Sequence, residues 1–222
     1  MVEVKSGLQF VDLPAGSFQF QGERTVAVAA FRMGVTAVTT AAYARCVEAR
    51  ACTLAEGQGC NSSLGIGLVL QGVDRLDHPV NCVDFDQATA FCRWVGGRLP
   101  TEEEREYAAS GGSEDRVHPW GEGEPGERAC WSGAAPEAAR KSTCPVGAHR
   151  AGASRWGQRD LAGNVWEWTT SDYVPLGRDR TPVGKVVRGG SWKDPAERLR
   201  ARSRHWLETH AADSTVGFRC VF

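Results

Sequence analysis

Three short stretches near the C-terminus decide the fold: Gly163-Asn164-Val165-Trp166-Glu167-Trp168, then Arg188-Gly189-Gly190-Ser191-Trp192, then Gly217-Phe218-Arg219-Cys220. The region around them is rich in glycine, tryptophan and short apolar runs, which is typical of strands and turns rather than helices. We therefore expect strands at residues 165–170, 185–188, 199–203 and 216–222. Residues 7–33 also read as short strands, with a turn at Gly22.

Helical patterns lie between these two strand regions. Thr39 or Thr40 can cap a helix over residues 41–49. The stretch from Cys52 to Gly72 that follows has no hydrophobic period, and we expect a long loop pinned by cysteines.

Two further helices are expected after this loop. One starts at Asp84 or Asp86, because four apolar residues at i, i+3, i+4 and i+7 share a face: Ala88, Phe91, Cys92 and Val95. The other starts with a capping box between Thr101 and Glu104 and runs to Ser110. Together with the strands, these helices indicate an α+β fold.

The composition is that of a single globular domain. The 222 residues are 41% hydrophobic and 24% charged, and no linker divides them, so we expect one domain over residues 1–222. No apolar run approaches the length of about 18 residues that predicts a membrane span. A formal net charge of −1 argues against nucleic acid as a partner, because binding phosphates needs a basic excess. The sequence does not predict an oligomeric state.

Eight cysteines are spread along the chain, and none of them forms a C-x-x-C pair: Cys46, Cys52, Cys60, Cys82, Cys92, Cys130, Cys144 and Cys220. These spacings fit zinc poorly and favour disulfides, which persist in oxidising compartments. Residues 1–5 have neither the basic start nor the apolar core of a signal peptide. We expect an extracytoplasmic protein whose signal segment is not in this chain. The alternative is a native start at residue 1, with a cytosolic location and reduced thiols.

A row of arginines lies between the second and third C-terminal stretches: Arg198, Arg200, Arg202 and Arg204. In an extended strand all four guanidinium groups point to one side. We expect internal carboxylates such as Glu102, Glu103, Glu106, Asp172 or Glu208 to pair with them. An anion-binding groove is the alternative.

Three more motifs precede the C-terminal ones: His78-Pro79-Val80, Gly97-Arg98-Leu99-Pro100-Thr101-Glu102 and Pro119-Trp120-Gly121. In this order the six motifs resemble the formylglycine-generating enzyme family, also called the sulfatase-modifying factor family, from about Phe10 to the C-terminus. The resemblance implies a variant of the C-type lectin fold. Two main helices would pack beside irregular, twisted antiparallel strands, with much loop and with the termini close together.

Enzymes of this family oxidise a sulfatase cysteine to formylglycine, using oxygen and a copper(I) ion held by two cysteines just after the Gly-Gly-Ser motif. Here that stretch, residues 192–200, contains no cysteine. Because copper(I) selects thiolates, we expect no copper and no formylglycine-generating activity. Trp166 and Ser191 remain as a vestigial pocket, and no catalytic residue is assigned.

The resemblance also implies a calcium ion, with four ligands at the positions Asp160, Gly163, Val165 and Glu167. A second calcium site near Cys130 lacks its acidic ligand, and a Cys130–Cys144 disulfide is expected in its place. The resemblance further pairs Cys92 with Cys220. The other four cysteines can then pair in three ways.

These observations predict a catalytically altered recognition module that is stabilised by disulfides and calcium. Its ligand, a protein or an anionic molecule, would meet the former active-site face at Trp192, Arg200, Arg202, Arg204, His205 and Trp206. One alternative is an oxidoreductase with non-copper chemistry, holding a metal between His205 and His210 with Glu208. A second alternative is a diversified ligand-display protein, by analogy of fold.

Overall fold

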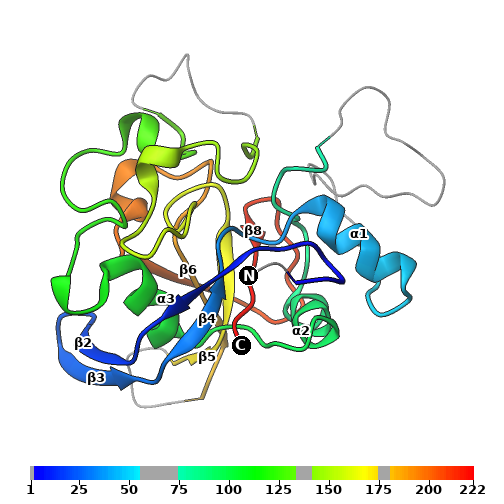
Figure 1. The fold of residues 1–222 in the computed structure, drawn as a ribbon, viewed down its shortest axis with the longest axis horizontal. Helices are drawn as coiled ribbons and strands as arrows, with labels where there is room; N and C mark the ends of the chain where they lie inside the picture. Colours follow the sequence, from blue (N-terminus) through cyan, green and yellow to red (C-terminus); the bar gives the residue numbers. More distant parts are fainter. Residues whose placement is uncertain (1–2, 56–74, 134–141, 175–180) are drawn as a thin grey trace.

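Four strands at the N-terminal end form two antiparallel pairs (Figure 1). Strand β1 (Phe10–Leu13) pairs with β4 (Phe31–Gly34), and β2 (Gly16–Phe20) forms a hairpin with β3 (Arg24–Val28). The hairpin turns at Gly22, which has a φ of 73°, as its position in the sequence predicted. The computed structural model describes four segments of the chain: residues 3–55, 75–133, 142–174 and 181–222.

Three α-helices form in the described residues, where the sequence predicted them: α1 (Thr40–Glu48), α2 (Phe85–Trp94) and α3 (Glu102–Ser110). Thr39 caps α1 by accepting a hydrogen bond from the Ala42 N–H at 3.1 Å. The capping box of α3 is also present, with Thr101 and Glu104 each bonding the other's backbone N–H. Most of the predicted loop at 52–72 lies outside the described residues.

A four-stranded sheet at the C-terminal end has the order β7-β6-β5-β8. Its strands are β5 (Trp166–Tyr173), β6 (Gly184–Arg188), β7 (Arg204–Leu207) and β8 (Val216–Gly217). The first two agree with the predicted strands at 165–170 and 185–188. Pairing is antiparallel except between β5 and β8, which run parallel.

The predicted strand at 199–203 is wrong. Residues 196–199 form a short 3₁₀ turn after Pro195, and the chain turns again at residues 200–203, where the Ser203 N–H bonds the Arg200 carbonyl at 2.9 Å. The strand in this region is β7, which starts at Arg204, so the four arginines do not share one strand face. The strand predicted at 216–222 is also shorter than expected. It ends at Gly217, and Val221 makes only isolated bridges to Met33 and Arg98.

The described core consists of two main clusters on opposite sides of the C-terminal sheet. In β5, Trp166 and Trp168 face the cluster that contains residues of α1 and α2, while Glu167 between them contacts α3. The second cluster joins the β1–β4 strands to Tyr107 and Ala108 of α3. In Figure 1, α1 and α2 accordingly lie on one side of β5 and α3 on the other.

The chain ends close to where it starts, as the family resemblance implied (Figure 1). Phe222 and Arg32 exchange backbone hydrogen bonds of 2.9 and 3.0 Å. The Phe222 ring also lies edge-on against Phe10, with ring centres 4.7 Å apart. Within the described residues no helix is both long and apolar enough to span a membrane.

Both predicted disulfides are present. Cys92 on α2 bonds Cys220, and Cys130 bonds Cys144. A third bond joins Cys46 to Cys52, which resolves one of the open pairings. Cys82 is also disulfide-bonded, and Cys60 lies outside the described residues. No cysteine in the described part of the chain is free.

The disulfide loops differ greatly in length, which gives a stability prediction. The Cys92–Cys220 bond closes a separation of 128 residues and Cys46–Cys52 one of 6. On the chain-entropy estimate, C92A/C220A lowers the free energy of unfolding by about 5 kcal/mol and C46A/C52A by about 2 kcal/mol. Urea denaturation of both double variants measures this. Equal losses would contradict the loop-length argument.

Candidate functional site

A cavity of about 400 Å³ opens where β5 begins, between the loop after Ser191, strand β7 and residues 213–216. Trp166 and Ser191, the two residues predicted as a vestigial pocket, both line it. Both come from the motifs that identify the fold. The cavity therefore contains both residues that the resemblance assigned to the former active-site pocket.

Asp194 organises this cavity, and the sequence analysis did not single it out. Its carboxylate accepts hydrogen bonds from the Trp166 indole N–H at 2.8 Å, the Ser191 backbone N–H at 2.9 Å and the Ser191 hydroxyl. The signal was present in the sequence, because an acid three residues after a serine can close a local side-chain turn. Asp194 thereby fixes the two vestigial residues in place.

Three basic side chains line the same cavity: Lys193, Arg198 and His205. Within the described residues, the side chains of Lys193 and Arg198 make no hydrogen bond and no ion pair. Burial lowers the pKa of His205 below its ordinary value, Arg198 lowers it further, and Asp194 opposes both. The His205 ring lies 5.9 Å from the Trp166 ring, centre to centre.

The described side chains do not form a nucleophile–base pair in this cavity. The Ser191 hydroxyl donates directly to Asp194, and no imidazole lies between them as a general base would. Copper(I) does not fit either, because it requires thiolates and every cysteine in the described part of the chain is disulfide-bonded.

Three of the six predicted ligand residues are engaged elsewhere. Arg202 forms an ion pair with Asp115 at 2.6 Å, and Arg204 pairs with Glu102 at 2.8 Å. Trp206 stacks on Tyr173, with ring centres 5.6 Å apart. Of the four arginines in the row, Arg204 thus pairs with one of the expected carboxylates, and Arg202 pairs with Asp115, which was not among them.

The other three predicted ligand residues differ in position. His205 lines the cavity. Trp192 does not line it, but its indole N–H donates at 3.2 Å to the carbonyl of Ser214, which does. Arg200 is exposed and borders a different cavity, next to Asp115 and Arg202. Of the six predicted ligand residues, only His205 lines the cavity around Asp194.

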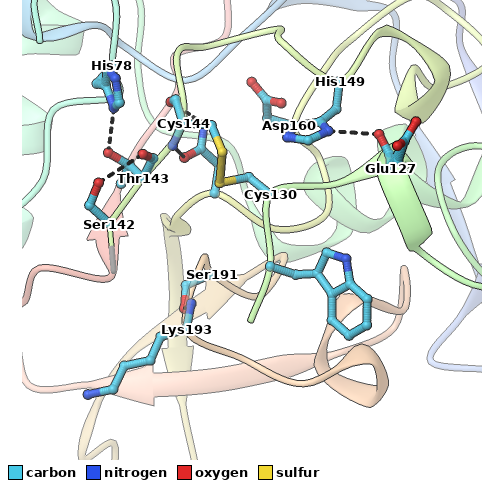
Figure 2. Close-up of a disulfide and its surroundings, with 12 residues drawn as sticks. His78, Glu127, Cys130, Ser142, Thr143, Cys144, His149, Asp160, Ser191 and Lys193 are labelled. Atoms are coloured by element: carbon cyan, nitrogen blue, oxygen red, sulfur yellow. Dashed lines mark hydrogen bonds between the residues drawn. A yellow bond between two sulfur atoms is a disulfide. The ribbon is translucent and has the colours of Figure 1, made fainter. Parts of the chain in front are cut away.

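The alternative metal site between His205 and His210 is not assembled in the described residues. His210 forms an exposed pair with Glu208 at 3.0 Å, while His205 faces Trp166. Among these residues, the one group of three or more side chains that could hold a metal is Cys130, Cys144 and His149 (Figure 2).

The Cys130–Cys144 group is a cross-link beside the cavity loop rather than a metal centre. The two sulfur atoms are bonded to each other, so neither offers a thiolate to a metal (Figure 2). His149 Nδ1 lies 2.7 Å from the Glu127 carbonyl oxygen. The Asn164 side chain bonds the backbone of Cys144 in both directions, at 3.1 and 3.2 Å. Asn164, two residues before the start of β5, thus connects this disulfide to that strand.

The two acidic residues among the four predicted calcium ligands do not fit a calcium ion. The Glu167 carboxylate is fully buried and bonds two guanidinium groups, those of Arg105 and Arg219, at 2.7 Å each. Burial raises the pKa of Glu167, but the two arginines outweigh it and hold the pKa below its ordinary value. Asp160 turns to the Gly147 N–H at 2.6 Å, and burial raises its pKa. We therefore place no calcium at these residues.

The fold, the motif residues around the cavity and the disulfides define a protein of the formylglycine-generating enzyme class. Residues 2–222 match the family described as sulfatase-modifying factor enzyme 1-like domain. The chain belongs to this family.

Relatives within the family include active and inactive members by name. The inactive C-alpha-formylglycine-generating enzyme 2 of Mus musculus is 39% identical over 159 residues, which is 67% of this chain and 50% of that protein. The formylglycine-generating enzyme of Streptomyces coelicolor is 37% identical over 170 residues, which is 66% of this chain and 53% of that protein. The chain thus spans about half the length of these relatives.

Solved structures share the fold over almost the whole chain. PvdO from Pseudomonas aeruginosa has a TM-score of 0.77 at 23% identity, covering 100% of this chain and 96% of PvdO. Treponema denticola variable protein 1 has a TM-score of 0.72 at 21% identity, covering 96% of this chain and 94% of that protein. These likenesses confirm the predicted α+β fold class and do not address activity.

Asp194 is predicted to hold the cavity together. D194A leaves the Trp166 indole N–H and the Ser191 groups without their acceptor, which costs about 1–3 kcal/mol of unfolding free energy. K193A, at the exposed neighbouring position, serves as the control and changes stability by less than about 0.5 kcal/mol. Urea denaturation compares the two. A D194A protein as stable as K193A would contradict this role for Asp194.

Proposed function

We propose that this chain is a non-catalytic member of its family that binds a small anionic ligand in the cavity around Asp194. Its similarity to a relative named as inactive supports the loss of catalysis. So does the cysteine chemistry, because no thiolate pair is available in the described residues to hold copper(I).

Two basic side chains without a hydrogen-bond acceptor carry the proposal. The acidic groups are satisfied internally: Asp194 by Trp166 and Ser191, and Asp213 by the N–H and hydroxyl of Thr215, at 2.7 and 2.6 Å. The basic groups Lys193 and Arg198 have no such partner among the described residues. The formal charges of these two acids and two bases cancel, so what Lys193 and Arg198 lack is a hydrogen-bond acceptor. A carboxylate or phosphate supplies one, since charge-assisted hydrogen bonds to anions are the strong ones.

The size and the walls of the cavity favour a small ligand. Its volume of about 400 Å³ is typical of small-molecule sites. Trp166, Leu207 and Val216 add apolar surface beside the basic groups. A carboxylate or phosphate joined to a compact apolar body matches this combination. A folded protein as the partner is the alternative outcome of the binding test.

We also propose an extracytoplasmic location. Cys92–Cys220 joins helix α2 to the end of the chain, and the Cys130–Cys144 and Cys46–Cys52 bonds pin loops. Disulfides of this number are rare in a reducing cytosol. A mass-spectrometric count of free thiols on protein isolated from its native compartment tests this, and reduced cysteines would contradict it.

The anion proposal is tested with a panel of small carboxylates and phosphates, starting with citrate, phenylacetate and inorganic phosphate. Calorimetry is expected to show binding to the unmodified protein. With R198A the Kd is expected to rise about 10-fold to 100-fold, which is the equivalent of one charge-assisted hydrogen bond. R200A removes an exposed arginine outside this cavity and is the matched control. Equal effects of R198A and R200A would place the anion elsewhere, and capture of a folded protein without any small anion would overturn the proposal.

The absence of catalysis is tested separately. Under anaerobic conditions the oxidised protein is titrated with copper(I) and with iron(II), and oxygen consumption is then measured in the presence of a cysteine-containing peptide. We expect no stoichiometric metal complex and no oxygen uptake, because no described cysteine is free. A tight complex of one metal per chain with turnover would show that the protein is an enzyme.

A further inference from the structure

A buried cluster of two arginines and one glutamate lies at the loop between Arg159 and Glu167, away from the ligand cavity. Glu167, Arg105 and Arg219 are all at most 1% exposed. Arg105 Nε bonds one carboxylate oxygen of Glu167 at 2.7 Å, and Arg219 bonds both oxygens, at 2.7 and 2.8 Å. Three N–H groups therefore surround a single carboxylate.

The same two guanidinium groups also bind the backbone of the loop. Arg105 Nη2 donates to the Leu161 carbonyl at 2.9 Å. Arg219 Nη2 donates to the carbonyls of Arg159 and Asp160 at 2.9 and 3.3 Å. A carboxylate and several carbonyl oxygens gathered around positive charge form the ligand set that a hard cation such as calcium prefers.

The local charges balance without a metal. Glu167 and Asp160 together carry at most two negative charges, and Arg105 and Arg219 carry two positive ones. A calcium ion bound to the same oxygens would add two uncompensated positive charges in a buried region, which is strongly unfavourable.

The neighbouring strand end leaves room for the Arg105 side chain. Gly189 has a φ of 107°, and a Cβ at this position would lie 2.8 Å from Arg105 Nη2 and 3.1 Å from the Leu161 carbonyl oxygen. A side chain here would press on the guanidinium and on the carbonyl that it binds. Gly189, in the Arg-Gly-Gly-Ser-Trp stretch, therefore leaves free the space that the Arg105 guanidinium occupies.

We propose that Arg105 takes the place of a divalent cation at this loop, so that the fold carries its own positive charge and is independent of calcium. Because Arg105 lies on α3, its positive charge reaches the loop only when α3 packs against the sheet. Removal of the Arg105 guanidinium then leaves the Leu161 carbonyl without its donor and the two carboxylates with only Arg219 to balance them, and calcium takes up this excess negative charge. This inference does not depend on the proposed ligand cavity.

Thermal unfolding with chelator and with calcium tests the proposal on the full chain with its disulfides intact. The melting temperature of the unmodified protein is expected to be equal in both conditions. R105A is expected to melt lower in chelator and to gain about 5–10 °C when calcium exceeds its Kd by about 100-fold. The control is R24A, which removes a half-exposed arginine of β3 that pairs with Glu103 of α3. This variant should not respond to calcium.

A second variant covers the case in which R105A does not fold in chelator. R105M keeps much of the side-chain volume without the charge, and refolding of either variant in calcium but not in chelator supports the proposal. Variants that remain unfolded in calcium overturn it, because an ion then cannot replace the guanidinium. Calcium bound to the unmodified protein at one ion per chain, measured by elemental analysis, overturns it as well.

Discussion

The contact between α3 and the C-terminal sheet depends on buried charge, and the rest of the structure is arranged around it. Glu167 of β5 faces Arg105 of α3, and Arg188 at the end of β6 bonds Glu102 and Glu106 of the same helix. Ion pairs this deeply buried gain little net stability, but loss of one partner leaves an unpaired charge and costs about 3–5 kcal/mol. These pairs therefore fix how α3 and the sheet align more than they strengthen the contact.

The positions of the cavity walls depend on these buried ion pairs. Trp166, which lines the cavity, is adjacent in sequence to Glu167, and alternation along β5 sends the two side chains to opposite faces. Arg188 comes three residues before Ser191, at the other wall. The arginine–carboxylate pairs hold the two strands from behind, so the loop carrying Lys193 and Arg198 rests on a rigid base. Substitutions in that loop therefore alter the lining of the cavity without disturbing the frame.

The parts of the structure that follow local rules could be predicted from the sequence. The caps at Thr39 and Thr101 are examples, because a capping residue and its partner lie within a few positions of each other. The family resemblance supplied what local rules cannot, such as the bond between Cys92 and Cys220. The failures involve long-range competition. Residues 199–203 alternate like a strand, yet the Ala201 N–H bonds the distant Val117 carbonyl and the Ser203 N–H closes a turn onto the Arg200 carbonyl.

The calcium expectation rests on local spacing in the same way, whereas the charges around its two acids are set by long-range contacts. Asp160 and Glu167 read as ligands because their spacing matches the family, but the deciding residue, Arg105, is 62 positions from Glu167 and sits in what reads as an ordinary helix. At the position where the resemblance implies a second ion site, the Cys130–Cys144 bond joins the loop instead. A covalent cross-link and a guanidinium thus each hold a loop at which the resemblance implied an ion. Neither varies with metal supply, so a frame built this way keeps its cavity in shape at any metal concentration.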